Sequence, residues 1–437
     1  MGQTLTEKIL AEHAGRLNVI PGENIWIDVD LLMTHDVFGP EVFRIFEREF
    51  GSNASVWDPA RVVVIPDHFI FTSDARALRN LEVLDAFVRK HEISAYYPAR
   101  TASYKGVCHA TLASEGFNLP GTVLFGTDSH TCTSGAFGLF ATGIGNTDAA
   151  FVLGTGRLWV RVPETMRFDF EGTLPPYLMA KDLILHVIGD IGVDGASYRS
   201  MEFGGEGIRS LSMEERMTLC NMAIEAGGKN GIIEADAVTR DYLAQRGRIV
   251  EHALAPDPDA TYHSRRRYRS DTIAPTVAKP HSPDNRDEAQ NLSDVRLDRC
   301  YIGSCTGGKR EDFLAAARIL AAGKVEIDTF VVPATTDVAR ELETEHIGDR
   351  SLLRIFQDAG CKIGPPSCGA CPGGPPDTFG RANGSERVLS TTNRNFPGRM
   401  GSAKSEVYLA SPLTVAASAR TGRITDPREF MNMNGAT

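Results

Sequence analysis

The sequence predicts an α/β fold with largely parallel sheets. Short apolar, β-branched runs alternate with longer amphipathic stretches along its 437 residues, which is typical of layered α/β domains. A chain of this length exceeds one ordinary hydrophobic core, so we expect more than one domain. Its content of 42% hydrophobic and 23% charged residues is that of a globular protein in water.

The individual elements follow from these runs. Residues 61–66 read Arg-Val-Val-Val-Ile-Pro, an apolar run that predicts a buried strand ended by proline. Residues 329–333 repeat that pattern. Further strands are expected at 123–125 and 299–302, and helices at 75–90 and 311–322.

Two changes in composition suggest domain boundaries. A glycine-rich stretch at 135–156 closes a first α/β domain, expected at residues 1–160. A second α/β domain, 161–285, ends in a stretch rich in Pro and Asp at 255–285, which resembles a connection and carries a solvated run of arginines at 265–267. A third α/β domain is expected at 286–430, followed by a tail at 431–437.

Charge and cysteine usage exclude several classes of protein. The net charge of −10 disfavours nonspecific binding to nucleic acid. The first residues lack the basic-then-apolar order of a signal peptide, so we expect none, and no apolar run approaches the length needed to span a bilayer. Eight scattered cysteines without a secretion signal indicate free thiols and metal ligands instead of disulfides. We therefore expect a cytoplasmic protein.

Three cysteines stand in contexts typical of cluster ligands. Cys305 lies between glycines after an expected strand, and Cys368 and Cys371 form a CxxC pair in a Pro/Gly-rich loop. The pair alone would also suit a redox disulfide or half a zinc site. A cubane iron–sulfur cluster that carries electrons is normally held by four thiolates. Three would leave one iron free to act on a substrate as a Lewis acid. The other cysteines predict mainly small buried side chains (Cys108, Cys132, Cys220, Cys300, Cys361).

Histidines paired with carboxylates form a second set of motifs in the first half of the chain. Histidine held by a carboxylate suits proton transfer to a departing hydroxyl. One motif follows the expected strand at 123–125, and strand ends of this kind commonly form α/β sites. The motifs are His35-Asp36, Asp67-His68, His109 with Glu115, and Asp128-Ser129-His130.

Polar residues in the second half and near residue 220 complete the candidate set. Arg394 and Arg399, in a Gly/Pro turn that begins at Asn393, suit bidentate recognition of carboxylates. Asn221 and Glu225 are spaced so that one helix would present both on one side.

Together these motifs resemble the aconitase family of iron–sulfur hydro-lyases, and within it the large subunits of the 3-isopropylmalate dehydratase and homoaconitase group. The resemblance runs from about Thr4 to Pro427. It implies three α/β/α domains around a central [4Fe-4S] cluster. It also implies that a fourth, swivelling domain with the serine base is supplied by a separate small subunit.

The resemblance also implies roles for the motif residues. Cys305, Cys368 and Cys371 would hold the cluster, with one iron lacking a protein ligand. Asp67 and His68 would handle the proton of the departing hydroxyl. The other roles would be to surround the iron-bound water (His109, His130, Glu225), to line the same wall (Asp128, Ser129), to bind substrate carboxylates (Arg394, Arg399), and to contact or support the substrate (His35, Asp36, Asn221, Asn393).

Three positions depart from patterns found in the family. Gly307 follows the Cys-Thr pair where many relatives have Asn, which removes a polar group near the cluster. Ala370 stands where the CxxC loop usually has Pro, and Thr133 stands where aconitases proper have Asn. None of these changes removes a thiolate, so cluster binding is still expected.

The implied reaction is dehydration and rehydration of a hydroxy di- or tricarboxylic acid. The preferred substrate is 3-isopropylmalate, in leucine biosynthesis, and homocitrate, 2,3-dimethylmalate, methylcitrate or citrate stay open. Two other classes stay open as well. One is an iron-sensing RNA-binding protein, which the acidic charge disfavours. The other is a zinc or electron-transfer site, which would need a fourth ligand such as Cys300 or Cys361.

Overall fold

The computed structural model describes residues 2–431, which form two compact units. The first unit comprises residues up to 104 together with 111–171 and 196–268. The second comprises residues 105–110, 172–195 and 269 onward. Helix α4 (Cys108–Ser114) contributes residues to both units. Most of the expected tail at 431–437 lies outside the described residues.

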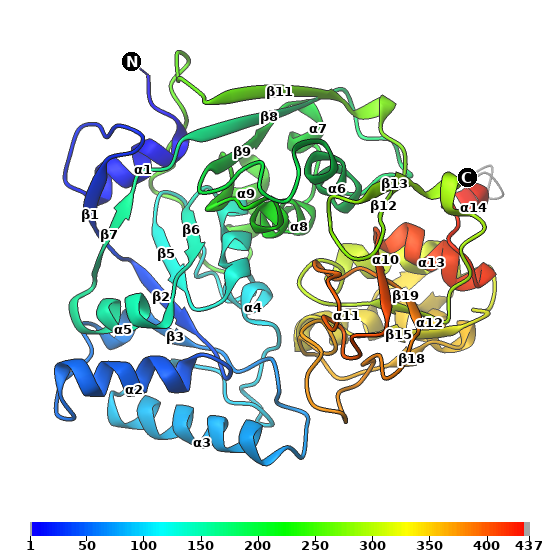
Figure 1. The fold of residues 1–437 in the computed structure, drawn as a ribbon, viewed down its shortest axis with the longest axis horizontal. Coiled ribbons are helices and arrows are strands. Elements are labelled where there is room, and N and C mark those ends of the chain that lie inside the picture. The colour runs from blue at the N-terminus through cyan, green and yellow to red at the C-terminus, as the bar shows by residue number, and fades with distance from the viewer. Residues whose placement is uncertain (1, 432–437) are drawn as a thin grey trace. The chain divides into compact units, whose positions relative to one another are not determined.

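A five-stranded, wholly parallel sheet is the centre of the first unit (Figure 1). Its strands, in spatial order, are β4 (Ala95–Tyr96), β3 (Val62–Val64), β2 (Leu31–Thr34), β5 (Val123–Gly126) and β6 (Phe140–Gly143). The apolar faces of helices α2 (Gly39–Phe50) and α3 (Ala75–Lys90) pack together through the stacked rings of Phe43 and Phe87. Strands buried on both faces explain the continuous valine run in β3.

The first unit also contains a four-stranded sheet and an antiparallel strand pair. The four strands, in spatial order, are β10 (Asn230–Ile233), β9 (Ser200–Gly204), β8 (Thr165–Glu171) and β11 (Ser264–Arg269). The pair is β1 (Asn24–Asp28) with β7 (Arg157–Arg161). The remaining helices of this unit are α1 (Leu5–His13), α5 (Asn146–Thr155), α7 (Glu206–Arg209), α8 (Met213–Asn221) and α9 (Ala237–Ala244), with 3₁₀ helices η1 (Pro59–Arg61), η2 (Ser129–Phe137) and η3 (Met222–Ala226).

A seven-stranded mixed sheet is the centre of the second unit. Its strands, in spatial order, are β13 (Arg286–Glu288), β12 (Thr276–Ala278), β20 (Glu406–Leu409), β19 (Arg387–Ser390), β14 (Arg299–Ile302), β15 (Asp328–Val331) and β18 (Lys362–Ile363). The run from β20 to β18 is parallel. The other elements are α6 (Ala180–Ile191), α10 (Arg310–Leu320), α11 (Thr336–Thr344), α12 (Leu352–Ala359), α13 (Pro412–Thr421), α14 (Arg428–Met431), η4 (Ser270–Thr272), η5 (Ala289–Leu292) and the hairpin of β16 (His346–Ile347) and β17 (Arg350–Ser351).

The predicted α/β class, strands and helices are confirmed. The helix expected at 75–90 is α3, and the helix expected at 311–322 is α10, which begins one residue earlier and ends two residues earlier. The stretch at 255–285 is more than a connection, because it contributes β11 and the buried strand β12. The arginine run at 265–267 is exposed on β11, as expected. The division into three domains stays a prediction.

Within residues 2–431, the helices are either too short or too polar to cross a lipid bilayer.

Candidate functional site

In the first unit, three neighbouring parallel strands end in the His/carboxylate motifs. His35-Asp36 follows β2, Asp67-His68 follows β3, and Asp128 follows β5. Because the carboxyl ends of parallel strands meet at one edge of a sheet, residues far apart in the sequence come together there. The first two motifs are tied directly, since Asp36 Oδ1 accepts the backbone N–H groups of Asp67 at 2.9 Å and His68 at 3.0 Å.

His68 is held as a cation. Its Nδ1 donates to Asp67 Oδ1 at 2.6 Å, and its Nε2 lies 3.8 Å from Asp128 Oδ2. Burial alone favours the neutral ring, but the carboxylates of Asp67, Asp36 and Asp128 outweigh it and raise the pKa of His68 to about 10. A protonated imidazole oriented by a buried carboxylate is equipped to donate a proton.

The neighbouring ring of His35 is held neutral. Burial, and then the charge on His68, lower the pKa of His35. The two rings stack with centroids 4.3 Å apart, and His35 Nδ1 accepts the N–H of Val37 at 3.4 Å. His35 Nε2 has no hydrogen-bond partner among the described residues and lies 4.0 Å from Asp128 Oδ2. Side-chain atoms of His35, Asp36, Asp67 and His68 lie within 4.8 Å of one another. With His68 protonated and oriented by Asp67, this group of side chains is arranged for proton transfer.

A second His–carboxylate pair lies in the same unit. His130 Nε2 contacts Glu225 Oε1 at 2.8 Å, and the backbone N–H of His130 donates to Asp128 Oδ1 at 2.7 Å. Asn221 Nδ2 donates to Thr133 Oγ1 at 2.7 Å. The chain changes from α8 to the 3₁₀ helix η3 directly after Asn221, so the expected continuous α-helix is wrong. Both side chains nevertheless reach the same element, η2.

In the second unit, the three cysteines gather in one buried cluster. Cys305, Cys368 and Cys371 pack together with Val107, Ala110 and Ala334. Cys305 follows β14, and the loop of Cys368 and Cys371 follows β18, so the parallel strands again deliver functional groups from their carboxyl ends. The residue before Cys305, Ser304, has a φ of 74°, a left-handed conformation that non-glycine residues rarely adopt and that often marks functional sites.

Polar groups from a neighbouring strand meet the thiols. Asn393 follows β19, and its Nδ2 donates to Cys305 Sγ at 3.5 Å while its Oδ1 lies 3.4 Å from Cys371 Sγ. Arg399 Nη2 donates to Cys371 Sγ at 3.5 Å. N–H groups aimed at sulfur stabilise thiolates. Tyr301 is fully buried, and its hydroxyl lies against Gly369 of the CxxC loop. The three thiols and the N–H donors around them fit an inorganic cluster.

Two other cysteines of the second unit lie apart from this group. Cys300 and Cys361 belong to the main hydrophobic core, not to the small cluster around Cys305. Cys300 Sγ donates to the carbonyl of Val415 at 3.6 Å. Burial raises the pKa of Cys300, and it raises that of Cys361 to about 12, so both stay protonated. Neither is arranged as a fourth ligand, which counts against the zinc or electron-transfer alternative.

The structure shows why position 307 holds a glycine, where many relatives have Asn. Thr391 occupies the space beside Gly307, where a Cβ would lie 2.0 Å from Thr391 Oγ1. Thr391 Oγ1 accepts the N–H of Gly303 and donates to its carbonyl, both at 2.9 Å. The threonine hydroxyl thus ties the turn before Cys305 to the end of β19.

The other predicted residues are placed as follows. His109 is buried in the first turn of α4, in the segment whose Val107 and Ala110 pack on the cysteines. Arg394 is half-buried after β19, and Ser129 begins η2 with its Oγ 3.4 Å from His130 Nδ1. Glu115 contacts the hydroxyl of Tyr97.

Two buried lysines near the cysteines were missed. Lys309 Nζ donates to the carbonyl of Cys305 at 3.2 Å and to Asp312 Oδ2 at 2.7 Å. Lys181 Nζ donates to the carbonyls of Thr391 and Thr392 at 3.0 and 2.6 Å. No local motif marks a lysine as buried, so sequence offered no signal for Lys181. Lys309 stands four residues after Cys305, which could have drawn attention to it.

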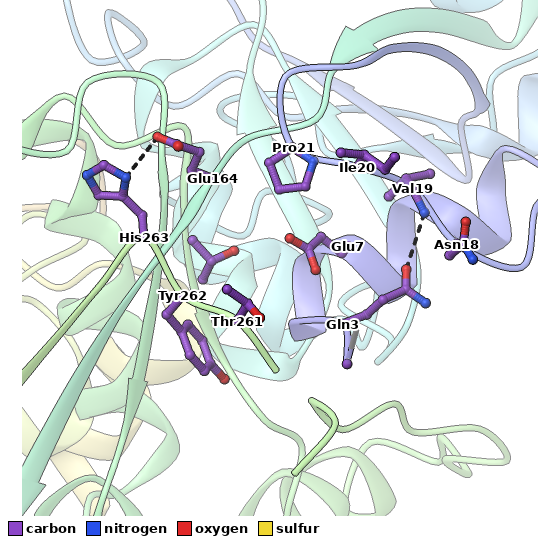
Figure 2. Close-up of a pocket in the computed structure, with 12 residues that line it drawn as sticks. Gln3, Glu7, Asn18, Val19, Ile20, Pro21, Glu164, Thr261, Tyr262 and His263 are labelled. Atoms are coloured by element: carbon purple, nitrogen blue, oxygen red, sulfur yellow. Dashed lines mark hydrogen bonds and ion pairs between the residues drawn. The ribbon is translucent and has the colours of Figure 1, made fainter. Parts of the chain in front are cut away.

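A cavity of about 400 Å³ lies elsewhere in the first unit (Figure 2). It lies beside the start of the N-terminal helix α1, and none of the predicted site residues lines it. Its polar side chains serve the fold. Glu164 pairs with His263 at 3.1 Å, Gln3 Oε1 accepts the N–H of Val19, and Glu7 Oε2 accepts the N–H of Thr4.

Asp67→Asn should bring the pKa of His68 down toward the ordinary histidine value, because it removes the carboxylate that holds the Nδ1 proton. Titration of the His68 ring by NMR checks this. In the wild type, the folded pKa lies above the unfolded value of 6.5. The stabilisation is therefore complete below that pH and is lost as pH rises through about 10. The variant should show a flatter decline of the unfolding free energy over this window, and an unchanged slope would contradict the assignment.

Gly307→Ala should destabilise the protein by about 1–3 kcal/mol, because the added Cβ would collide with Thr391. Urea unfolding of the metal-free protein measures this. Gly384→Ala is the matched control, since no atom lies within 4 Å of its added Cβ. Equal unfolding midpoints for the two variants would show that the space beside Gly307 accommodates a Cβ without a collision with Thr391.

The chain is similar to known proteins along nearly its whole length. The model of the aconitase family (aconitate hydratase) matches residues 7–422. The chloroplastic 3-isopropylmalate dehydratase large subunit of Arabidopsis thaliana is 55% identical, over 98% of this chain and 87% of that protein. The corresponding large subunits of Aquifex aeolicus and Heliobacterium modesticaldum are each 45% identical, over 99% and 98% of this chain and 98% and 100% of theirs. A solved structure, holo-form aconitase X of Thermococcus kodakaraensis, aligns at 14% identity with a TM-score of 0.49, over 89% of this chain and 88% of that one. From the family match and these identities, the chain belongs to the aconitase family of hydro-lyases.

Proposed function

We propose that this chain is the cluster-bearing large subunit of a hydro-lyase that interconverts 2- and 3-isopropylmalate by dehydration and rehydration. The observation that carries the proposal is the gathering of three buried cysteines, Cys305, Cys368 and Cys371, beside N–H donors from Asn393 and Arg399. The named relatives, which are large subunits of 3-isopropylmalate dehydratase, support the choice of substrate.

Membership of the aconitase family implies an iron–sulfur cluster. We assign Cys305, Cys368 and Cys371 as its ligands and propose the [4Fe-4S] form, with one iron free of protein ligands. When bound, such a cluster supplies a Lewis acid for a substrate hydroxyl and carboxylate. The chain's own contribution is to bury the thiols and to direct N–H groups at Cys305 and Cys371.

The proton chemistry is assigned to the first unit. His68 donates its proton to the departing hydroxyl, and Asp67 and Asp36 orient it. The protonated state of His68 supports this role, since a general acid must hold its proton at the working pH. His130, fixed by Glu225, would bind the water that leaves and returns, together with His109. The remaining polar residues of this unit would line the substrate site (Asp128, Ser129, His35, Asn221).

The arginines after β19 are assigned to the substrate. A dicarboxylate needs cationic, bidentate partners, which guanidinium groups provide. Arg394 would bind one carboxylate. Arg399 already contacts Cys371 and would serve a carboxylate beside the cluster. Asn393 contacts both Cys305 and Cys371 and would fix the position of the cluster relative to the two arginines.

A small subunit is the proposed partner, because the relatives are named as large subunits. By its resemblance to the family, we expect that subunit to carry the swivelling domain and the serine that removes the substrate's C–H proton. A cytoplasmic location stays a prediction.

Replacing the cysteines one at a time tests the cluster assignment. Cys305→Ser, Cys368→Ser and Cys371→Ser should each abolish the cluster after anaerobic reconstitution with iron and sulfide, because each removes a ligand. Visible absorption and iron content report the outcome. Cys361→Ser is the matched control and should keep the cluster, since that thiol lies in the main core. If Cys361→Ser abolished cluster binding while Cys305→Ser did not, the ligand set would be wrong.

A substrate panel tests the reaction. The reconstituted chain with a small subunit should hydrate and dehydrate isopropylmalate, and His68→Gln should lower kcat by about 10²- to 10⁴-fold, the usual contribution of general acid catalysis. Absorbance of the unsaturated intermediate acid follows the reaction. If the protein instead turned over homocitrate, dimethylmalate, methylcitrate or citrate, the assigned reaction class would stand. The choice of isopropylmalate as substrate would be wrong.

A further inference from the structure

Lys181 is a buried cation without an anionic partner. It is the second residue of α6, its side chain is 1% exposed, and its Nζ donates only to the carbonyls of Thr391 and Thr392. Within the described part of the chain, no carboxylate lies within ion-pair distance of it. The adjacent Asp182 directs its carboxylate elsewhere, to the backbone N–H groups of Met179 and Thr276.

This arrangement is unfavourable for the protein on its own. A buried ammonium loses its hydration, and two carbonyl dipoles replace only part of it. The N-terminal turn of a helix carries partial positive charge, which adds repulsion. Burial accordingly lowers the pKa of Lys181 to about 7. An apolar side chain of similar length would fill the same space without these costs.

Cysteines ionised as cluster ligands would balance the charge of Lys181. Cys305 and Cys371 are the strongest influences that favour its charged form. Asp312 contributes less, and it is already paired with Lys309 at 2.7 Å. Lys181 donates to the carbonyls of the two residues directly before Asn393. The side-chain amide of Asn393 in turn contacts both Cys305 and Cys371. Lys181 therefore connects to the thiols both by charge and through one short backbone segment.

We propose that Lys181 is a positioning residue for the cluster: its buried ammonium opposes the negative charge of the thiolate-held iron–sulfur core, and its contacts with Thr391 and Thr392 anchor the Asn393 turn. The inference rests on the proposed function, since it requires the cluster. Buried charge near such a cluster shifts its reduction potential and its affinity for the protein. Lys309 is different, because Asp312 already neutralises it.

Lys181→Gln tests the charge, since glutamine keeps an N–H donor for the carbonyls and removes the cation. In the full chain without cluster, this variant should unfold at the same or a higher temperature than the wild type. After anaerobic reconstitution, it should release iron to a chelator sooner, with an affinity for the cluster about 10- to 100-fold lower. Its reduction potential should be more negative, because the cation no longer stabilises the added electron.

Two further variants serve as controls. Lys181→Arg keeps the charge and should keep the potential near that of the wild type. Lys309→Gln breaks a local ion pair and should lower the unfolding temperature with and without cluster. Suppose that Lys181→Gln destabilised the chain equally with and without cluster and left the reduction potential of the cluster unchanged. Lys181 would then serve only to hold the backbone of Thr391 and Thr392, and the inference would be overturned. Wild-type protein that takes up no cluster would instead overturn the proposed function, and the inference with it.

Discussion

The alignment of parallel strands is the constraint on which both halves of the chemistry depend. In a parallel sheet the carboxyl ends of neighbouring strands lie at one edge, so loops far apart in the sequence deliver side chains to the same place. In the first unit β2, β3 and β5 bring together His35, His68 and Asp128. In the second unit β14, β18 and β19 do the same for the cysteines and Asn393.

The two units treat buried charge in opposite ways. Around His68, carboxylates outnumber cations, so the ring stays protonated while the stacked His35 stays neutral. Around Lys181, a cation is buried without a carboxylate in contact, and Cys305 and Cys371 are the groups that most favour its charged form. In the first arrangement, the protein's own carboxylates balance the charge of His68, which suits proton donation. In the second, the charge of Lys181 is balanced only when anionic sulfur is present. A chain that holds an iron–sulfur cluster should show this dependence.

The sequence was sufficient for features that local pattern determines. Valine runs and glycine-flanked cysteines are short-range signals, and they correctly gave β3, β15 and the loop after Cys305. Lys181 could not be predicted, because the carbonyls that bury it lie 210 and 211 residues further along the chain. Thr391 was missed for the same reason: its contact with Gly303 joins two strands. The strand β12 was overlooked because Pro and Asp around it resemble a linker, although Val277 is fully buried.

The most direct test of the account is Mössbauer spectroscopy of the chain reconstituted anaerobically with ⁵⁷Fe and sulfide, with a small subunit present. The account predicts a four-iron cluster in which the signal of one iron shifts when 3-isopropylmalate is added, because that iron alone lacks a cysteine. A cluster whose irons all respond alike, or the absence of any cluster, would contradict it.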